Sequence, residues 1–310
     1  MDHAKRTALE AAAKRIRLGI VEGVHAAASG HPGGSLSVAD TLTYLYMNRM
    51  NVDPANPEMA DRDRLVLSKG HTAPALYACL AHRGFFPVED LKTLRHTGSY
   101  LQGHPCVHIP GVDMSTGSLG QGVSAAVGMA IAGKLDKKDY TVFALLGDGE
   151  IQEGQVWEAA MMAGYRKLDN LCVIVDNNNL QIDGTIDTVC SPYPIDKKFE
   201  AFNFHVINVD GHDFDELEAA FKEARVVKGK PTAIIAKTIK GKNVSFMDSS
   251  GIGMILGRYR KMGEKPGNMA IVCCSKPVRN IMNMAGVFSI IDYFDTREEA
   301  LLFFGRKEVS

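Results

Sequence analysis

The chain has 310 residues, of which 45% are hydrophobic and 23% charged, the balance of an ordinary globular protein. Its formal net charge of −1 creates no bulk field that would attract a nucleic acid or a membrane surface. The six cysteines match neither a zinc-binding pattern nor a disulfide framework, no apolar run approaches the roughly 18 residues of a membrane helix, and the charged N-terminus lacks a signal-peptide pattern. We therefore expect a soluble protein of the reducing cytoplasm.

Apolar strands alternate with helices along the first three quarters of the chain. The patterns predict strands over 64–67, 141–146, 171–175, 205–209 and 231–238, and helices over 7–28, 73–83, 153–167 and 213–228, with a further helix from an N-cap at Ser37 to about residue 48. Apolar strands separated by helices form a parallel sheet that is covered on both faces. The predicted fold class is therefore α/β, with a doubly wound parallel sheet.

Two strand ends in the middle of the chain carry oxygen-bearing side chains. Asp148 lies in the turn Gly147–Gly149 directly after one apolar strand, and Asn178 follows the next strand. Ligands of open α/β sheets bind at the carboxyl ends of the strands, so a carboxylate and an amide oxygen here suit Mg²⁺ or Ca²⁺ bound together with phosphate. The neighbouring glycines let backbone N–H groups approach the phosphates, and the next helix adds a favourable dipole.

Residues 147–184 read GDGEIQEGQVWEAAMMAGYRKLDNLCVIVDNNNLQIDG. This segment resembles the thiamine diphosphate signature, which begins with GDG and closes with NN, in the form found in transketolases, particularly the short N-terminal subunit of two-chain transketolases. The resemblance extends over about residues 1–244. It implies that thiamine diphosphate is bound through Mg²⁺ or Ca²⁺. Its implied metal ligands are the side chains of Asp148 and Asn178 and the carbonyl oxygen of Leu180; its cofactor-binding residues include Gly147, Asp148, Gly149, Glu153 and Asn178, and Glu158 matches a further acidic position.

Three histidines each follow a glycine in a turn: His31 in SGHPGG, His71 in LSKGH and His104 in QGHP. An imidazole in such a turn can donate to phosphate or sugar hydroxyls and move protons near neutral pH. The resemblance implies that all three are catalytic, with His71 near the diphosphate and His31 and His104 at the ketose hydroxyls. It also implies that Gly117 and Leu119, in STGSLGQG, pack on the aminopyrimidine of the cofactor.

The resemblance to transketolase ends near residue 244. The WHG triplet of two-chain transketolases has no counterpart, and no histidine follows His212, so the family's last active-site histidine is absent. Residues 245–310 resemble the second half of an anti-sigma factor antagonist (the STAS family), without the opening strands and first helix of that family. Ser250, in DSSG before an apolar run, is a good N-cap and matches the family's phosphorylated serine.

We therefore expect a hybrid of two domains, 1–244 and 245–310, joined near Val244–Met247. The tail is expected to form a small, incomplete α/β unit. Its pattern predicts helices near 249–262, 277–284 and 297–304, and strands near 269–274 and 287–292.

The resemblance implies a protein that transfers a two-carbon ketol unit between sugar phosphates. In that family a glutamate on a separate pyrimidine-binding domain completes the cofactor site. We therefore expect an oligomer whose partner is a transketolase C-terminal subunit, with no turnover by this chain on its own. Two alternatives stay open: another thiamine diphosphate enzyme, such as a deoxyxylulose-phosphate-synthase-like enzyme or a subunit of an oxo-acid dehydrogenase, and a non-enzymatic, phosphorylation-responsive STAS-type binding module.

Overall fold

The computed structural model describes residues 1–181, 184–241, 270–272, 279, 282 and 287–307. The chain divides into two compact units, Met1–Lys242 and Asn243–Ser310. Among the described residues, no helix combines the length and the apolar character that crossing a membrane requires.

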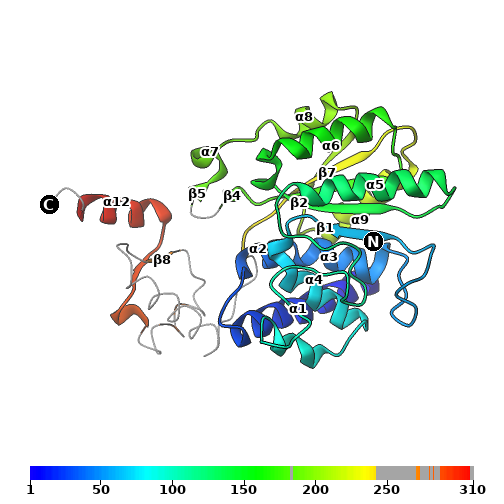
Figure 1. The fold of residues 1–310 in the computed structure, drawn as a ribbon. Helices are drawn as coiled ribbons and strands as arrows, with labels where there is room; N and C mark the ends of the chain where they lie inside the picture. The colour runs from blue at the N-terminus through cyan, green and yellow to red at the C-terminus, as the bar shows by residue number, and fades with distance from the viewer. Residues whose placement is uncertain (182–183, 242–269, 273–278, 280–281, 283–286, 308–310) are drawn as a thin grey trace. The chain divides into compact units, whose positions relative to one another are not determined.

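A five-stranded parallel sheet forms the centre of the first unit (Figure 1). Its order is β1 (Arg64–Leu67), β2 (Val142–Gly147), β3 (Leu171–Asn177), β7 (Thr232–Lys237) and β6 (His205–Asp210). Every residue of β2 and β3 is buried, as the continuous apolar runs predicted. The predicted doubly wound α/β fold is therefore confirmed.

Helices cover both faces of this sheet. On one face, α5 (Gln121–Leu135), α6 (Gly154–Tyr165) and α8 (Ile195–Ala201) share a buried apolar cluster with the strands. On the other face, α9 (Phe214–Val226) places the ring of Phe221 against Phe143 of β2 and Tyr44 of α3 (Ala39–Tyr44). Behind it, α1 (His3–Ala26) packs on α4 (Ala73–Arg83). The remaining elements of this unit are α2 (Pro32–Ser37), a π-helical turn (Leu45–Arg49), 3₁₀ turns at Gly70–Thr72, Val88–Thr93 and Glu150–Gln152, the hairpin of β4 (Leu180–Gln181) and β5 (Gly184–Thr185), and α7 (Ile186–Val189).

The helix predicted from an N-cap at Ser37 to about residue 48 is present as α3 and the π-helical turn that follows it, but its N-cap is Val38, so the predicted cap is wrong. A separate helix, α2, precedes it. Pro32 occupies the first turn of α2, where its fixed φ favours a helix start. Ser37 is the last residue of α2. Its hydroxyl lies within hydrogen-bond distance of two acceptors, the carbonyl oxygen of Gly34 and the carboxylate of Asp176. The side chain therefore joins α2 to the end of β3 and caps no helix.

The described part of the second unit contains β8 (Ala270–Val272) paired in parallel with β9 (Asp292–Phe294), a 3₁₀ turn at Val287–Ser289, and α12 (Arg297–Lys307). The helix predicted near 297–304 and the strand predicted near 269–274 are confirmed, whereas the strand predicted near 287–292 begins only at Asp292 and a 3₁₀ turn precedes it. Val287 and Ile291 are the buried residues there, and their spacing of four suits a helical turn, which the hydrogen bond from the Ile291 N–H to the Val287 carbonyl closes. The helix expected near 249–262, most of that expected near 277–284, and Ser250 lie outside the described residues.

Candidate cofactor and metal site

The carboxyl ends of β2 and β3 lie side by side, with Gly147 paired to Asp176. Asp148 follows β2 and is only 2% exposed. Its carboxylate accepts hydrogen bonds from the N–H groups of Gly149, at 2.9 Å, and Asn179, at 2.6 Å. The two segments singled out in the sequence, one at each strand end, are thus in direct contact.

Asp148 is a buried carboxylate whose charge is poorly balanced. Burial raises the pKa of Asp148 to about 6; the N–H of Asn179 opposes this effect and the neighbouring charge of Asp176 adds to it. Within the ranges that the structure describes, no lysine or arginine forms an ion pair with Asp148. A bound cation would compensate the negative charge of Asp148, so this carboxylate is suited to be a metal ligand.

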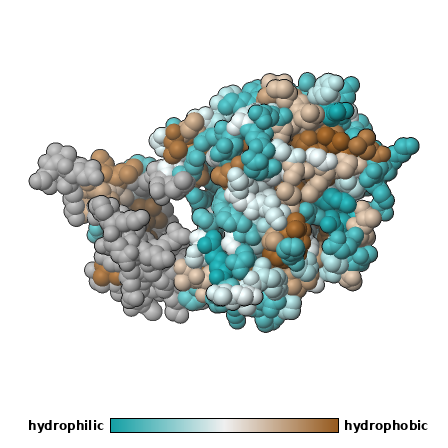
Figure 2. All heavy atoms as spheres, in the orientation of Figure 1, coloured by the Kyte–Doolittle hydropathy of each residue, from teal (hydrophilic) through white to brown (hydrophobic). Residues whose placement is uncertain are grey.

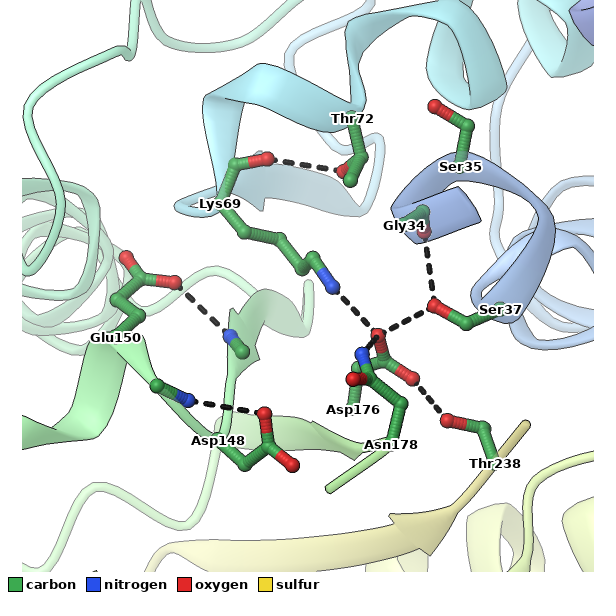
Figure 3. Close-up of polar contacts among 12 residues, drawn as sticks. Gly34, Ser35, Ser37, Lys69, Thr72, Asp148, Glu150, Asp176, Asn178 and Thr238 are labelled. Carbon is green, nitrogen blue, oxygen red and sulfur yellow. Dashed lines mark hydrogen bonds and ion pairs between the residues drawn. The ribbon is translucent and has the colours of Figure 1, made fainter. Parts of the chain in front are cut away.

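Asp176 organises the neighbouring polar groups (Figure 3). Its carboxylate accepts hydrogen bonds from the side chains of Ser37, Lys69, Asn178 and Thr238, which come from four separate segments. Burial alone would raise the pKa of Asp176, but the charge and hydrogen bond of Lys69 outweigh it and hold the pKa below its usual range. Asp176 is therefore an ionised anchor that orients the amide of Asn178 through a 2.8 Å hydrogen bond.

Asn178 is thereby fixed in a single orientation. Its Nδ2 donates to Asp176, and its Oδ1 accepts the N–H of Leu180 at 3.1 Å. Leu180 opens the short β4–β5 hairpin and is 37% exposed. The three predicted metal ligands, Asp148, Asn178 and Leu180, therefore come from two adjacent strand ends.

Glu150 is a second buried carboxylate at this place, and sequence reasoning did not identify it. It accepts hydrogen bonds from the Ser68 hydroxyl at 2.5 Å and from the N–H groups of Gly120 and Gly147 at 3.0 Å each. These bonds tie the ends of β1 and β2 to the start of α5. Burial raises the pKa of Glu150, and the hydrogen bonds from Ser68, Gly120 and Gly147 oppose that rise. The sequence signal that could have identified Glu150 was its position directly after the Gly147–Gly149 turn.

Glu153, predicted to bind the cofactor, occupies the N-cap position of α6 without a side-chain cap bond. Its side chain and that of Glu158 are both exposed. In the part of the chain that the structure describes, neither carboxylate forms an ion pair or a side-chain hydrogen bond. Their cofactor role stays a prediction.

The three predicted histidines converge on one corner of the unit. The rings of His31 and His71 meet edge to face with centroids 5.2 Å apart. Gly117 lies beside His104, since a Cβ on this glycine would come within 3.4 Å of the His104 ring. Burial lowers the pKa of His71 to about 3, and the positive charges of Lys69, His31, His104 and Lys240 lower it further. His71 is therefore neutral, in surroundings that favour an anion.

The model of the transketolase thiamine diphosphate binding domain matches residues 8–253, most of the chain. The chain belongs to the transketolase family. Over 243 residues it is 47% identical to the 6-deoxy-6-sulfo-D-fructose transketolase subunit SqwG of Clostridium sp. (strain MSTE9), covering 78% of this chain and 87% of that subunit. It is 43% identical to an apulose-4-phosphate transketolase subunit of Phocaeicola vulgatus, covering 77% and 85% of the two chains. These relatives confirm the predicted enzyme class, a transferase of the transketolase type.

Solved transketolases share the fold of this family member. The Campylobacter jejuni enzyme superposes with a TM-score of 0.72 at 36% identity, over 82% of this chain and 42% of that one. The Leishmania mexicana enzyme superposes with a TM-score of 0.74 at 32% identity, over 89% and 44%. The chain thus spans less than half the length of these transketolases.

A STAS domain model matches residues 209–300, which confirms the second resemblance. This match begins upstream of the expected junction and shares residues 209–253 with the transketolase match. The shared residues include α9 and β7, and β7 lies in the sheet between β3 and β6. That part of the STAS match is therefore built into the transketolase fold.

Proposed function

We propose that this chain is the cofactor-anchoring subunit of a two-chain transketolase, which holds thiamine diphosphate through a divalent metal and transfers a two-carbon ketol unit between sugar phosphates with a partner subunit. The observation that carries this proposal is Asp148, a buried carboxylate that pairs with no cation among the described residues, beside Asn178 at the carboxyl edge of a transketolase sheet. The names of two relatives, each a transketolase subunit that this chain covers almost fully, support a partner subunit.

The donor set fits Mg²⁺ or Ca²⁺. Asp148 would supply a carboxylate oxygen, Asn178 its amide oxygen and Leu180 its backbone carbonyl oxygen, and such hard oxygen ligands suit either cation. Lys69 is held by Asp176, so it does not compete with a metal for Asp148. Diphosphate oxygens would complete the coordination. The N–H groups of Gly147 and Gly149, which were expected to approach the phosphates, donate instead to the carboxylates of Glu150 and Asp148.

The histidine corner fits the rest of the cofactor and the sugar. Thiamine diphosphate supplies a carbon nucleophile and an electron sink. Neutral His71 can donate to a phosphate oxygen, while the exposed imidazoles of His31 and His104 can bind and move protons at sugar hydroxyls. Leu119, 37% exposed next to Gly117, offers an apolar contact for an aromatic ring.

Calorimetric titration of the full chain with thiamine diphosphate, with and without Mg²⁺, tests the anchoring role. We expect saturable binding that requires the metal and weakens at least roughly tenfold in Asp148→Asn, because the amide cannot supply the missing charge. Asp136→Asn is the matched control, because this exposed aspartate caps the far end of α5. Metal-independent binding, or equal affinity of Asp148→Asn and wild type, would contradict the proposal.

The sugar donor can be tested once a partner subunit is present. One relative is named for a sulfonated ketose and another for a ketose phosphate, so both anion types belong in the assay. We expect transfer from a ketose phosphate and none from pyruvate. Use of pyruvate in place of ketoses would favour a different thiamine diphosphate enzyme.

A further inference from the structure

A buried polar cluster lies outside the site described above. Arg17 of α1 donates two hydrogen bonds to Asp40 of α3, at 2.8 and 2.6 Å. His212, in the turn between β6 and α9, contacts the same carboxylate through Nδ1 at 2.8 Å. The His212 side chain is only 2% exposed. Burial raises the pKa of Asp40, but the bonds from His212 and Arg17 outweigh it and lower the pKa, so Asp40 is ionised.

The hydrogen bonds define the protonation of His212. The backbone N–H of Ile239 donates to Nε2 of His212 at 2.9 Å, so Nε2 carries no proton. The proton must then be on Nδ1, from which it is donated to Asp40. His212 is therefore neutral and links a buried carboxylate to one backbone amide.

That amide belongs to the segment Thr238–Gly241, which leaves β7 toward the histidine corner; we call it the exit segment. Thr238 donates its hydroxyl to Asp176, and the N–H of Gly241 donates to the carbonyl of Gly33 at 3.2 Å. Lys240 lies against Gly33, since a Cβ on this glycine would come within 3.1 Å of the Lys240 side chain. The charge of Lys240 also reaches His71.

The side chain of Ile239 does not hold this segment. It is 60% exposed, and it lines a cleft of about 400 Å³ at the ends of β6 and β7, together with Asp210, Glu216 and Lys237. The space-filling view shows the mixed polar and apolar surface of the first unit (Figure 2). Ile239 is therefore held by the hydrogen bond from its backbone N–H to His212. Because few other described contacts hold Ile239, this hydrogen bond to the buried His212 determines how readily the segment opens locally.

We propose that His212 is a positioning residue: oriented by Asp40, it fixes the exit segment through the Ile239 amide and so keeps Lys240 beside Gly33 and His71. This inference rests on the proposed function, because Lys240 then contributes positive charge where the cofactor's diphosphate would bind. His212 itself touches neither the metal ligands nor the histidine corner in any described contact. It acts only through the exit segment.

Two substitutions separate the two bonds of His212. In His212→Asn the amide nitrogen can replace Nδ1 and keep the bond to Asp40, but nothing accepts the Ile239 N–H. In His212→Gln the amide oxygen can replace Nε2 and accept that N–H. We expect hydrogen exchange of the exit-segment amides in the full chain to accelerate about five- to tenfold in His212→Asn, the factor for one hydrogen bond, and to recover in His212→Gln.

Peptides from α5 serve as the internal control and should exchange at the same rate in all variants. Binding of Mg²⁺-pyrophosphate, measured by calorimetry, should weaken several-fold in His212→Asn and recover in His212→Gln. A merely structural role would instead lower the melting temperature of both variants and speed exchange everywhere. Unchanged exchange in His212→Asn, or equal effects of both variants, would overturn the proposal.

The wild-type protein provides an independent check if His212→Asn fails to fold. Long-range ¹H–¹⁵N spectra report the His212 tautomer directly, and we expect the Nδ1–H form. A protonated Nε2 would refute the positioning role. Wild-type protein that binds no Mg²⁺-thiamine diphosphate would refute the proposed function instead, while the exchange comparison would still decide the role of His212.

Discussion

The ion pair between Lys69 and Asp176 has both charges almost fully buried, with the nitrogen 2.5 Å from the carboxylate. Removing one partner of such a pair leaves an uncompensated buried charge, which is strongly destabilising. We expect Lys69→Met to lower the free energy of unfolding by about 3 to 5 kcal/mol, measured by urea denaturation.

A second ion pair provides the matched control. Lys134 and Asp169 lie at the same 2.5 Å, but the Lys134 side chain is 40% exposed. Lys134→Met should cost less than about 1 kcal/mol, as exposed pairs do. Equal losses for both variants would show that burial does not determine the strength of the Lys69 pair.

His71 predicts a dependence of stability on pH. Its folded pKa, about 3, lies below the unfolded value of 6.5, so the unfolded chain takes up the proton first as pH falls. The stability contributed by neutral His71 is full above pH 6.5 and is lost progressively toward pH 3, with a slope of at most about 1.4 kcal/mol per pH unit.

Comparison of wild type with His71→Gln isolates this effect, because the glutamine variant should lack that part of the slope in urea denaturation between about pH 4 and 7. The subtraction is needed because Asp148, whose folded pKa is raised to about 6, changes stability in the opposite sense over the same range. Identical slopes for the two proteins would show that His71 titrates normally.

The residues of the site were predictable where a motif singled them out. GDG and DNNN identified Asp148 and Asn178, and three Gly-His turns identified the histidines that meet in the structure. The supporting groups were not predictable, because Lys69, Glu150 and Asp176 are recognised by their burial and partners. The bond between Ser68 and Glu150 joins residues 82 positions apart, and the ion pair between Lys69 and Asp176 joins residues 107 positions apart, separations that no local pattern reveals.

At the scale of elements, two glycines within helices have opposite surroundings. A Cβ on Gly164 of α6 would overlap the carbonyl oxygen of Phe202, whereas a Cβ on Gly128 of α5 would meet nothing within 4 Å among the described atoms. We expect Gly164→Ala to cost at least about 2 kcal/mol, since backbone must move to admit it. Gly128→Ala should stabilise by about 0.5 to 1 kcal/mol, because alanine favours the helix.

Thermal denaturation of both variants, with the wild type alongside, measures this difference. A melting temperature of Gly164→Ala equal to that of wild type would mean that α6 and the turn at Phe202 separate at no cost. The close approach of this pair is a tertiary contact that neither segment reveals by itself. This contact illustrates why the helices and strands themselves were easier to predict from the sequence than the way they pack together.

Strands β2 and β3 were predictable because each contains a continuous apolar run, which a doubly covered parallel sheet requires. The errors occurred where short apolar runs allow either structure. Val287 and Ile291 fit a strand by composition but a helical turn by spacing. Ser37 has the residue type of an N-cap, yet its hydroxyl is used by Asp176 in β3, a contact that depends on tertiary structure.

At the scale of the whole molecule, two family matches overlap on residues 209–253. The structure places α9 and β7 of this overlap in the transketolase fold, where β7 pairs with both β3 and β6. The exit segment after β7 also contacts the candidate site through Thr238. The site therefore depends on residues that lie close in sequence to the second unit. For this reason, the activity assay with a partner subunit should use the whole chain.

That assay is the last prediction. In the proposed function, this chain would bind the metal, the diphosphate and the sugar hydroxyls, and the partner would supply the acid for the cofactor's aminopyrimidine. We expect no ketol transfer by the purified chain with thiamine diphosphate and Mg²⁺, and turnover once a transketolase C-terminal subunit is added. Asp148→Asn with the same partner is the control and should stay inactive. Turnover by the chain without a partner would contradict the two-chain proposal, whereas inactivity with the partner, in protein that binds the cofactor, would place the defect in substrate handling, where this chain lacks a histidine after His212.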